Sequence, residues 1–215
     1  MTDFVKTAAF AAKSSLALRG IKVQHGIALE VIAAFLGYKT YAALVVEQSS
    51  EALKYHLADA EVIVLDYQGG VSRLTELEAL QAFIVQDFID ALVNCRDGVF
   101  SDLPDFLDDY IQQELRDVIL SDESVINAVN RATGSDPFSV ELDEGKSFSE
   151  PLWGASDTWE VSGFGTVHGV DDRADVDDEA HESEEAIRCF GWVKFSKAGR
   201  AGLKFQRSGG EFVER

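Results

Sequence analysis

Residues 29–48 read LEVIAAFLGYKTYAALVVEQ, and this stretch decides the fold of the N-terminal part of the chain. Apolar residues recur at helical spacing over 24–36, and a second helical pattern begins after Thr40, which can cap it. Ala33 takes the small-residue position at which two helices cross closely, and Gly37 takes the turn between them. The expected core positions are Ile32, Leu36, Tyr38 and Val46. The spacing therefore predicts a helix-turn-helix.

Further helices are expected on both sides of this motif. The predicted elements are a helix over 3–18, a short helix over 41–47, a strand over 61–66, a break at Gly69-Gly70, a long helix from Ser72 to about Asn94, a helix opened by Asp102 and Pro104, and a helix capped by Ser121 that ends near Gly134. Residues 1–50 thus form a helical module, and residues 51–134 a strand with long helices.

The apolar pattern changes from helical spacing to period two between about residues 134 and 150. Alternating apolar residues predict strands over 159–167, 187–195 and 203–205, with a turn at 197–200. Residues 135–215 are therefore expected to form an antiparallel β region. The predicted fold class is α+β, with a helix-turn-helix-like N-terminal module, a helical middle and a C-terminal antiparallel sheet.

Charge is distributed unevenly along the 215 residues, which hold 38 acidic and 19 basic side chains for a net charge of -19. Residues 1–50 sum to +2, residues 51–187 to -26 and residues 188–215 to +5. A segment as acidic as the middle one repels phosphate backbones and attracts basic surfaces. It is also typical of a well-solvated surface, so both interpretations stay open.

The densest acidic run is 171–185, DDRADVDDEAHESEE, which is expected to form a loop between two strands. It is either a solvated loop or a contact loop for a basic partner. The candidate partner-binding residues are Asp171, Asp172, Asp175, Asp177, Asp178 and Glu179 in this run, and Asp102, Asp105, Asp108 and Asp109 in a second patch. The leading hypothesis is a non-catalytic interaction protein that binds and inhibits a basic protein or nucleoprotein complex.

A DNA-binding regulator is the alternative hypothesis, with the helix after Thr40 as its recognition helix. The candidate DNA-binding residues are Lys22, Lys39, Thr40 and Tyr41. DNA-reading helices usually present Arg, Lys, Asn or Gln to base edges and phosphates, whereas here Lys39 is opposed by Glu47. A compact helical hairpin that binds no DNA therefore stays open as well.

Several segments within residues 10–80 resemble a small helical module. They are SLALRGI at 15–21, QH at 24–25, ALE at 28–30, LGYKTY at 36–41, AL at 43–44, ADAE at 58–61, LD at 65–66 and Arg73. That module recurs in uncharacterised proteobacterial proteins, many on plasmids and other mobile elements, and beside glyoxalase-superfamily-related domains. The resemblance implies a mobile-element context, and it implies no reaction and no site residue. Within the leading hypothesis, the inhibition would then be anti-defence, either antirestriction or anti-CRISPR, or it would be inhibition of conjugation.

A metal-dependent enzyme is the third hypothesis. Clustered carboxylates suit a hard cation, but the 171–185 run lacks the turn glycine of an EF-hand, where it has Val176. A looser cation site with His168 or His181 stays an alternative. We assign no catalytic residue, no metal ligand and no cofactor, since the vicinal metal ligands of a glyoxalase domain are not recognisable downstream of the module.

The segment 188–207 interleaves basic residues with Phe190, Trp192, Phe195 and Phe205. Basic and aromatic side chains on strands can bind single-stranded nucleic acid by stacking and phosphate contact. At period two, the same pattern is typical of a half-buried sheet with a basic outer face. This +5 end can also dock against the -26 middle, within one chain or in a homo-oligomer.

The composition favours a cytoplasmic protein. Cys95 and Cys189 are too few for a disulfide framework, so reduced thiols are expected. No apolar run reaches the roughly 18 residues of a membrane-spanning helix, and residues 1–4 do not begin a signal peptide. We therefore expect no membrane partner.

Overall fold

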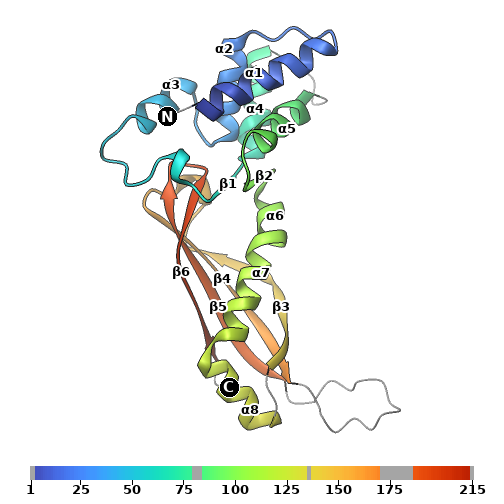
Figure 1. The fold of residues 1–215 in the computed structure, drawn as a ribbon, viewed down its shortest axis with the longest axis vertical. Helices are drawn as coiled ribbons and strands as arrows, with labels where there is room; N and C mark the ends of the chain where they lie inside the picture. Colours follow the sequence, from blue (N-terminus) through green and yellow to red (C-terminus); the bar gives the residue numbers. More distant parts are fainter. Residues whose placement is uncertain (1–2, 79–83, 135–136, 170–185, 214–215) are drawn as a thin grey trace. The chain divides into compact units, whose positions relative to one another are not determined.

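The computed structural model describes residues 3–78, 84–134, 137–169 and 186–213, and its fold is α+β, as predicted (Figure 1). It divides into two compact units: unit 1 is Met1–Phe106, Pro151–Thr158 and Ser196–Phe205, and unit 2 is Leu107–Glu150, Trp159–Phe195 and Gln206–Arg215. The expected segments 1–50, 51–134 and 135–215 are not these units, because unit 1 draws residues from all three. In the described ranges, no helix has the length and apolar character needed to cross a membrane.

Unit 1 is mainly helical. Its elements are α1 (Asp3–Leu18), α2 (His25–Phe35), α3 (Tyr41–Gln48), η1 (Leu57–Asp59), β1 (Val62–Val64), α4 (Tyr67–Glu78), α5 (Val85–Cys95), β2 (Val99–Phe100), α6 (Leu103–Asp105) and η4 (Leu152–Gly154). Strand β1 pairs in parallel with β2, and it pairs antiparallel with the first residues of β6 (Gly202–Phe212). The predicted helices over 3–18, 24–36 and 41–47 and the strand within 61–66 are confirmed.

The core of unit 1 lies among α1, α2, α4 and α5, which pack against one another. Small residues line the contact sides of α1 and α2, and Ala8, Ala12 and Ala33 are fully buried there. Because an alanine methyl occupies little space, these helices approach one another closely, and the large rings of Phe35 and Phe88 fill the remaining space.

The predicted break at Gly69-Gly70 is wrong, because α4 begins at Tyr67 and holds both glycines in its first turn. The Asp66 Oδ1 atom accepts a hydrogen bond from the Gly69 amide at 2.8 Å and so caps the helix. A Cβ atom at Gly70 would lie 2.3 Å from Cδ1 of Phe35. The glycine is therefore required by the close approach of α2 rather than by a turn. The predicted long helix over 72–94 is helical in its two described parts, α4 up to Glu78 and α5 from Val85, and residues 79–83 between them lie outside the described residues.

Unit 2 combines helices with an antiparallel sheet. Its elements are a π-helix (Phe106–Ile111, of which Phe106 belongs to unit 1), α7 (Gln112–Ser121), α8 (Glu123–Thr133), β3 (Pro137–Phe148), β4 (Thr158–Gly169), β5 (Ile187–Ala198) and most of β6. The strand order is β6-β5-β4-β3. The predicted strands over 159–167, 187–195 and 203–205 are confirmed, and β3, which carries many charges, was not predicted.

Helix α7 packs on the inner face of this sheet, where glycines make room for it. A Cβ atom at Gly191 would lie 2.9 Å from Cγ1 of Ile119, and one at Gly210 would lie 3.2 Å from the Ile119 backbone. Along the π-helix and α7, the buried positions are Phe106, Ile111, Leu115 and Ile119, with spacings of five, four and four residues. The five-residue spacing spans the π-helical turn, which closes hydrogen bonds five residues apart.

The cap of α8 corrects another prediction. The side chain of Asp122, rather than that of Ser121, accepts hydrogen bonds from the amides of Ser124 at 2.9 Å and Val125 at 3.3 Å. Ser121 is the last residue of α7, and its hydroxyl donates to the Val118 carbonyl. The helix ends at Gly134, as predicted, with a φ of +74°.

Candidate functional site

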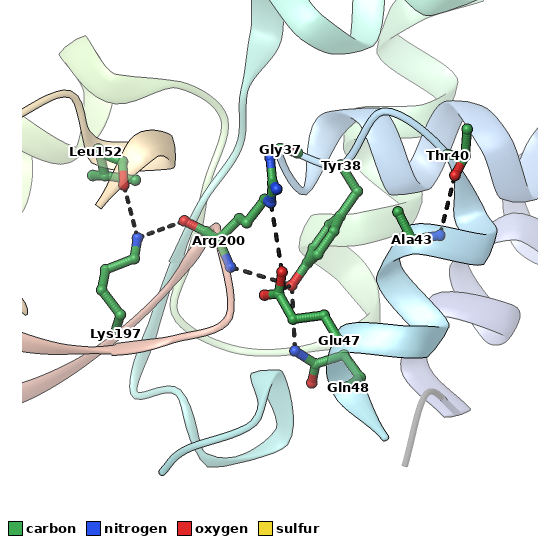
Figure 2. Close-up of polar contacts among 9 residues, drawn as sticks. All are labelled: Gly37, Tyr38, Thr40, Ala43, Glu47, Gln48, Leu152, Lys197 and Arg200. Atoms are coloured by element: carbon green, nitrogen blue, oxygen red, sulfur yellow. Dashed lines mark hydrogen bonds and ion pairs between the residues drawn. The ribbon is translucent and has the colours of Figure 1, made fainter. Parts of the chain in front are cut away.

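The helix-turn-helix region of unit 1 has the predicted local geometry. Gly37 adopts a φ of +81° in the turn, and the Thr40 hydroxyl caps α3 by accepting from the Ala43 amide at 3.1 Å (Figure 2). Ala33, Ile32 and Leu36 are fully buried, as expected for the close crossing of α2 and α3. Gly37 also lies tightly packed, since its Cβ atom would lie 3.1 Å from the Trp153 ring.

The outward side of α3 differs from the prediction. Val46 was expected in the core, but it is 70% exposed. The buried side chains are Leu44 and Gln48, which lie four residues apart on one side of the helix, so Val46 between them faces the opposite way. Ala42, Ala43 and Val45 are exposed as well. The outward surface of α3 is therefore apolar.

The four candidate DNA-binding residues have different surroundings. Lys22 and Lys39 are exposed. The Thr40 hydroxyl is engaged as a helix cap, and Tyr41 packs against the core of unit 1. Two of the four side chains therefore have local structural roles, and the two lysines are the ones that remain open to a phosphate.

Tyr38 is the centre of a polar network that joins α3 to the turn between β5 and β6 (Figure 2). Its hydroxyl donates to Glu47 Oε1 at 2.8 Å, and it accepts from Gln48 Nε2 at 3.3 Å and from the Arg200 amide at 3.2 Å. The Arg200 guanidinium lies 5.5 Å from the centre of the Tyr38 ring and 3.6 Å from Glu47 Oε2. Burial raises the pKa of Tyr38 far above its ordinary value of 10, so the neutral phenol is the stable form.

The turn from Lys197 to Gly202 is held closely against this network. Gly199 has a φ of +70°, and its Cβ atom would lie 2.6 Å from Gln48 Nε2 and 2.7 Å from the Tyr38 hydroxyl. Lys197 is buried, and its ammonium donates to the carbonyls of Leu152 at 2.9 Å and of Arg200. The network missed by the sequence prediction thus stabilises unit 1 by connecting segments far apart in the chain.

Two hollows flank this network, both lined partly by Trp153 and Arg200. The first, of about 500 Å³, has mixed walls that include Val46, Leu53 and Asp157. The second, of about 620 Å³, is lined by a mixture of charges: Lys39, Asp66, Arg73, Glu76 and Arg200. Because Arg73 pairs there with Glu30 at 2.8 Å and Glu76 at 3.2 Å, its charge is largely compensated. Neither hollow collects the residues of a recognisable reaction.

The second acidic patch divides into two kinds of carboxylate. Asp102 caps the helix start by accepting from the Asp105 amide at 2.9 Å, and Asp105 accepts from the Ser101 amide and hydroxyl at 3.1 and 2.9 Å. Asp108 and Asp109 are exposed on the π-helical turn, and Asp108 accepts from Gln112 at 3.2 Å. The first two carboxylates therefore have a structural role, and the last two are presented to solvent.

The first acidic patch, Asp171, Asp172, Asp175, Asp177, Asp178 and Glu179, lies outside the described residues, as does His181. His168 is half-buried, and its Nδ1 atom has no hydrogen-bond partner among the described residues. Within that part of the chain, no group of three or more His, Cys, Asp or Glu side chains could hold a metal ion. Cys189 is buried, which raises the pKa of its thiol to about 11.

Comparison of the chain with protein-family models, with curated proteins and with solved structures finds no match. The function is therefore argued from the residues of this chain.

Proposed function

We propose that this chain is a non-catalytic interaction protein that binds a basic, nucleic-acid-handling partner through its carboxylates. The observation that carries the proposal is the concentration of acidic side chains in residues 51–187, which have a net charge of -26. Among the described residues, Asp108 and Asp109 present exposed carboxylates of this kind. Such a surface attracts a basic partner from a distance and repels nucleic acid itself.

In the proposed mechanism, the carboxylates of this chain compete with nucleic-acid phosphates for the Lys and Arg side chains of the partner. A protein that binds nucleic acid places Lys and Arg side chains against phosphates, and their binding releases counterions. Carboxylates that occupy the same side chains prevent that contact. Because an exposed ion pair contributes about 0–1 kcal/mol, several carboxylates have to act together, and the interaction has to weaken with salt.

The resemblance of residues 10–80 supports a mobile-element context for this inhibition. An element that enters a new host benefits from a cytoplasmic protein that blocks a restriction, interference or conjugation complex. The resemblance supplies the setting, and the charge supplies the mode of binding.

The outward surface of α3 gives no support to sequence-specific DNA binding. Its exposed side chains are those of Ala42, Ala43, Val45 and Val46, which offer no hydrogen bonds to base edges. For this reason we favour a protein partner over an operator sequence.

The test has two stages. The tagged chain captures partners from a nuclease-treated lysate of a bacterial host, and the partner is then purified and loaded with labelled DNA. We expect a basic, DNA-binding partner, from which the chain displaces the DNA less well as salt is raised. Replacing the six carboxylates of 171–179 by Asn or Gln should weaken displacement at least tenfold, and D108N with D109N should weaken it less.

The matched control neutralises two exposed carboxylates on β3, E141Q with E144Q, and should leave displacement close to that of the natural chain. The proposal is wrong if the 171–179 variant displaces DNA as well as the natural chain does. It is equally wrong if displacement does not depend on salt.

A further inference from the structure

The sheet of unit 2 has an outer face, opposite to α7, that carries aromatic and basic side chains. Side chains alternate along a strand, so the neighbours of the inward glycines Gly163 and Gly191 point outward. We define the outer aromatic face by six residues: Phe164 on β4, Arg188, Phe190, Trp192 and Lys194 on β5, and Arg207 on β6. All six side chains belong to unit 2 and are partly or fully exposed.

Two rings of this face form a pair that is open to solvent. The ring centres of Phe164 and Phe190 lie 4.9 Å apart at an angle of 51°. Phe164 is 42% exposed, which is unusual for a phenylalanine inside a regular strand. The Arg188 guanidinium lies 5.3 Å from the Phe164 ring centre, so a cation stands beside the exposed ring.

The third ring lies against the backbone of the next strand. A Cβ atom at Gly209 would lie 2.8 Å from Cζ2 of Trp192, so a side chain there would push the indole away. The glycine allows one side of the ring to rest on β6, and the guanidinium of Arg207 lies 5.4 Å from the ring centre. A broad aromatic surface is therefore held in place on the sheet.

The three basic side chains beside these rings differ in whether a carboxylate pairs with them. Arg188 pairs with Asp143, which raises the pKa of the guanidinium and lowers that of the carboxyl, and Lys194 lies 3.8 Å from Glu160. No carboxylate of the described residues lies within 4.0 Å of the Arg207 guanidinium. Of the three cations, Arg207 is therefore the one whose charge is not compensated by a nearby carboxylate of the described residues.

We propose that the outer aromatic face binds single-stranded nucleic acid. The bases would stack on Phe164 and Trp192, and a phosphate would pair with Arg207, which is exposed and has no carboxylate within 4.0 Å among the described residues. Stacking requires an exposed base face, which a duplex does not offer, so single strands are the chemistry that this surface fits. This proposal goes beyond the proposed binding of a basic partner by carboxylates, and it does not depend on that binding. If the partner is a nucleoprotein complex, its single-stranded nucleic acid would give the chain a second contact with the same complex.

The test measures binding of the full chain to a fluorescein-labelled oligothymidylate of about 15 nucleotides by anisotropy, at about 50 and 200 mM salt. We expect binding at the lower salt concentration and weaker binding at the higher one. Trp192→Ala should weaken binding about tenfold or more, and Trp192→Phe, which keeps a ring, should weaken it less. Arg207→Gln should weaken binding and lower the dependence of log K on log salt by about 0.7.

Matched controls remove similar side chains elsewhere. Phe10→Ala removes a phenylalanine that is 64% exposed on α1, and Arg116→Gln removes an exposed arginine on α7. Both should bind the oligonucleotide as the natural chain does. Because Trp192→Ala can disturb β5, the substitution Arg207→Glu on an exposed side chain gives a second test with little risk to folding.

Three outcomes would overturn the proposal. The first is no binding at the lower salt concentration. The second is binding that Arg207→Glu and Trp192→Phe leave unchanged, which would place the contact elsewhere, for example at Lys22 and Lys39. The third is equal or tighter binding of a duplex of the same length. None of these outcomes bears on displacement of DNA from a basic partner, so the two proposals can fail separately.

Discussion

Units 1 and 2 use the same pair of residue types in opposite ways. In unit 1, Tyr38 and Arg200 form a cation–π contact that is surrounded by hydrogen bonds and a buried hydroxyl. In unit 2, Trp192 and Arg207 form a contact of nearly the same length on the outside of a sheet. An aromatic ring beside an arginine therefore indicates neither a structural nor a binding role. The two cases differ in the partners of the arginine. Arg200 also donates its amide to Tyr38 and lies near Glu47, whereas Arg207 has no carboxylate within 4.0 Å among the described residues.

The units also share a device, since each brings a large side chain against a glycine backbone. In unit 1 the Phe35 ring fills the space at Gly70, whereas in unit 2 the Trp192 ring covers Gly209 from the solvent side. The first contact is part of the core, and the second is at the surface. The two contacts should therefore respond differently to an added methyl group.

The largest effect is expected for Gly70→Ala, which places a methyl group within 2.3 Å of the fully buried Phe35 ring. The ring has to move, and overpacking of this kind outweighs the gain in helix propensity. We expect unit 1 to lose about 2–3 kcal/mol, measured by denaturant unfolding. Gly26→Ala is the control, because its added methyl group would have no packing neighbour within 4 Å beyond its own helix backbone and adjacent residues, and it should be neutral or slightly stabilising. Equal midpoints for the two variants would contradict the close packing of α2 and α4.

The next effect concerns Tyr38→Phe, which removes the hydroxyl at the centre of the network of unit 1. The Arg200 amide and the Gln48 amide each lose an acceptor, so we expect a loss of about 1–2 kcal/mol at neutral pH. Tyr67→Phe, on an exposed side chain, should leave stability unchanged.

The same substitution should change the pH dependence of stability. The pKa of Tyr38 is higher in the folded chain than the ordinary value of about 10, so its contribution is complete below pH 10. As the pH rises above 10, the unfolded chain loses this proton first and stability falls. Unfolding measured between pH 8 and 11 should show a smaller fall for Tyr38→Phe than for the natural chain. Parallel curves would mean that the phenol is not held in its neutral form.

The smallest effect separates two neighbouring caps in unit 2. Asp122→Ala removes the side chain that accepts from the amides of Ser124 and Val125, and we expect a loss of about 1 kcal/mol. Ser121→Ala, which the sequence pattern alone would favour as the damaging change, should have almost no effect. Thermal unfolding of the two variants measures the difference, and a larger loss for Ser121→Ala would contradict the assigned cap.

Much of the fold could be predicted because local spacing determines it. The helix-turn-helix, the short strand β1 and strands β4 to β6 follow from apolar periodicity and from glycines with positive φ. Strand β3 escaped prediction because its sequence, PFSVELDEGKSF, carries charges on both sides of a register shift between Leu142 and Lys146. Gly70 was misread because nothing local reveals the Phe35 ring, which lies 35 residues earlier in the chain.

The candidate sites were less accessible to prediction. Arg200 meets Tyr38 across 162 residues, and no periodicity reports such a contact. The basic and aromatic alternation over 188–207 was visible in the sequence, but which residues face outward depends on where α7 packs. The roles of Asp102 as a helix cap and of Asp105 as an acceptor from Ser101 also required the hydrogen bonds, since an acidic run looks the same whether its carboxylates are engaged or exposed.

The π-helical turn at Phe106–Ile111 has a consequence for how this chain can change in length. Its five-residue spacing keeps Phe106 and Ile111 buried in the same series as Leu115 and Ile119. A chain one residue shorter at this turn would continue the series at four-residue spacing in an ordinary α-helix. Loss of a single residue here therefore keeps Leu115 and Ile119 in one series with Phe106, so the π-helical turn accommodates one extra residue inside the helix.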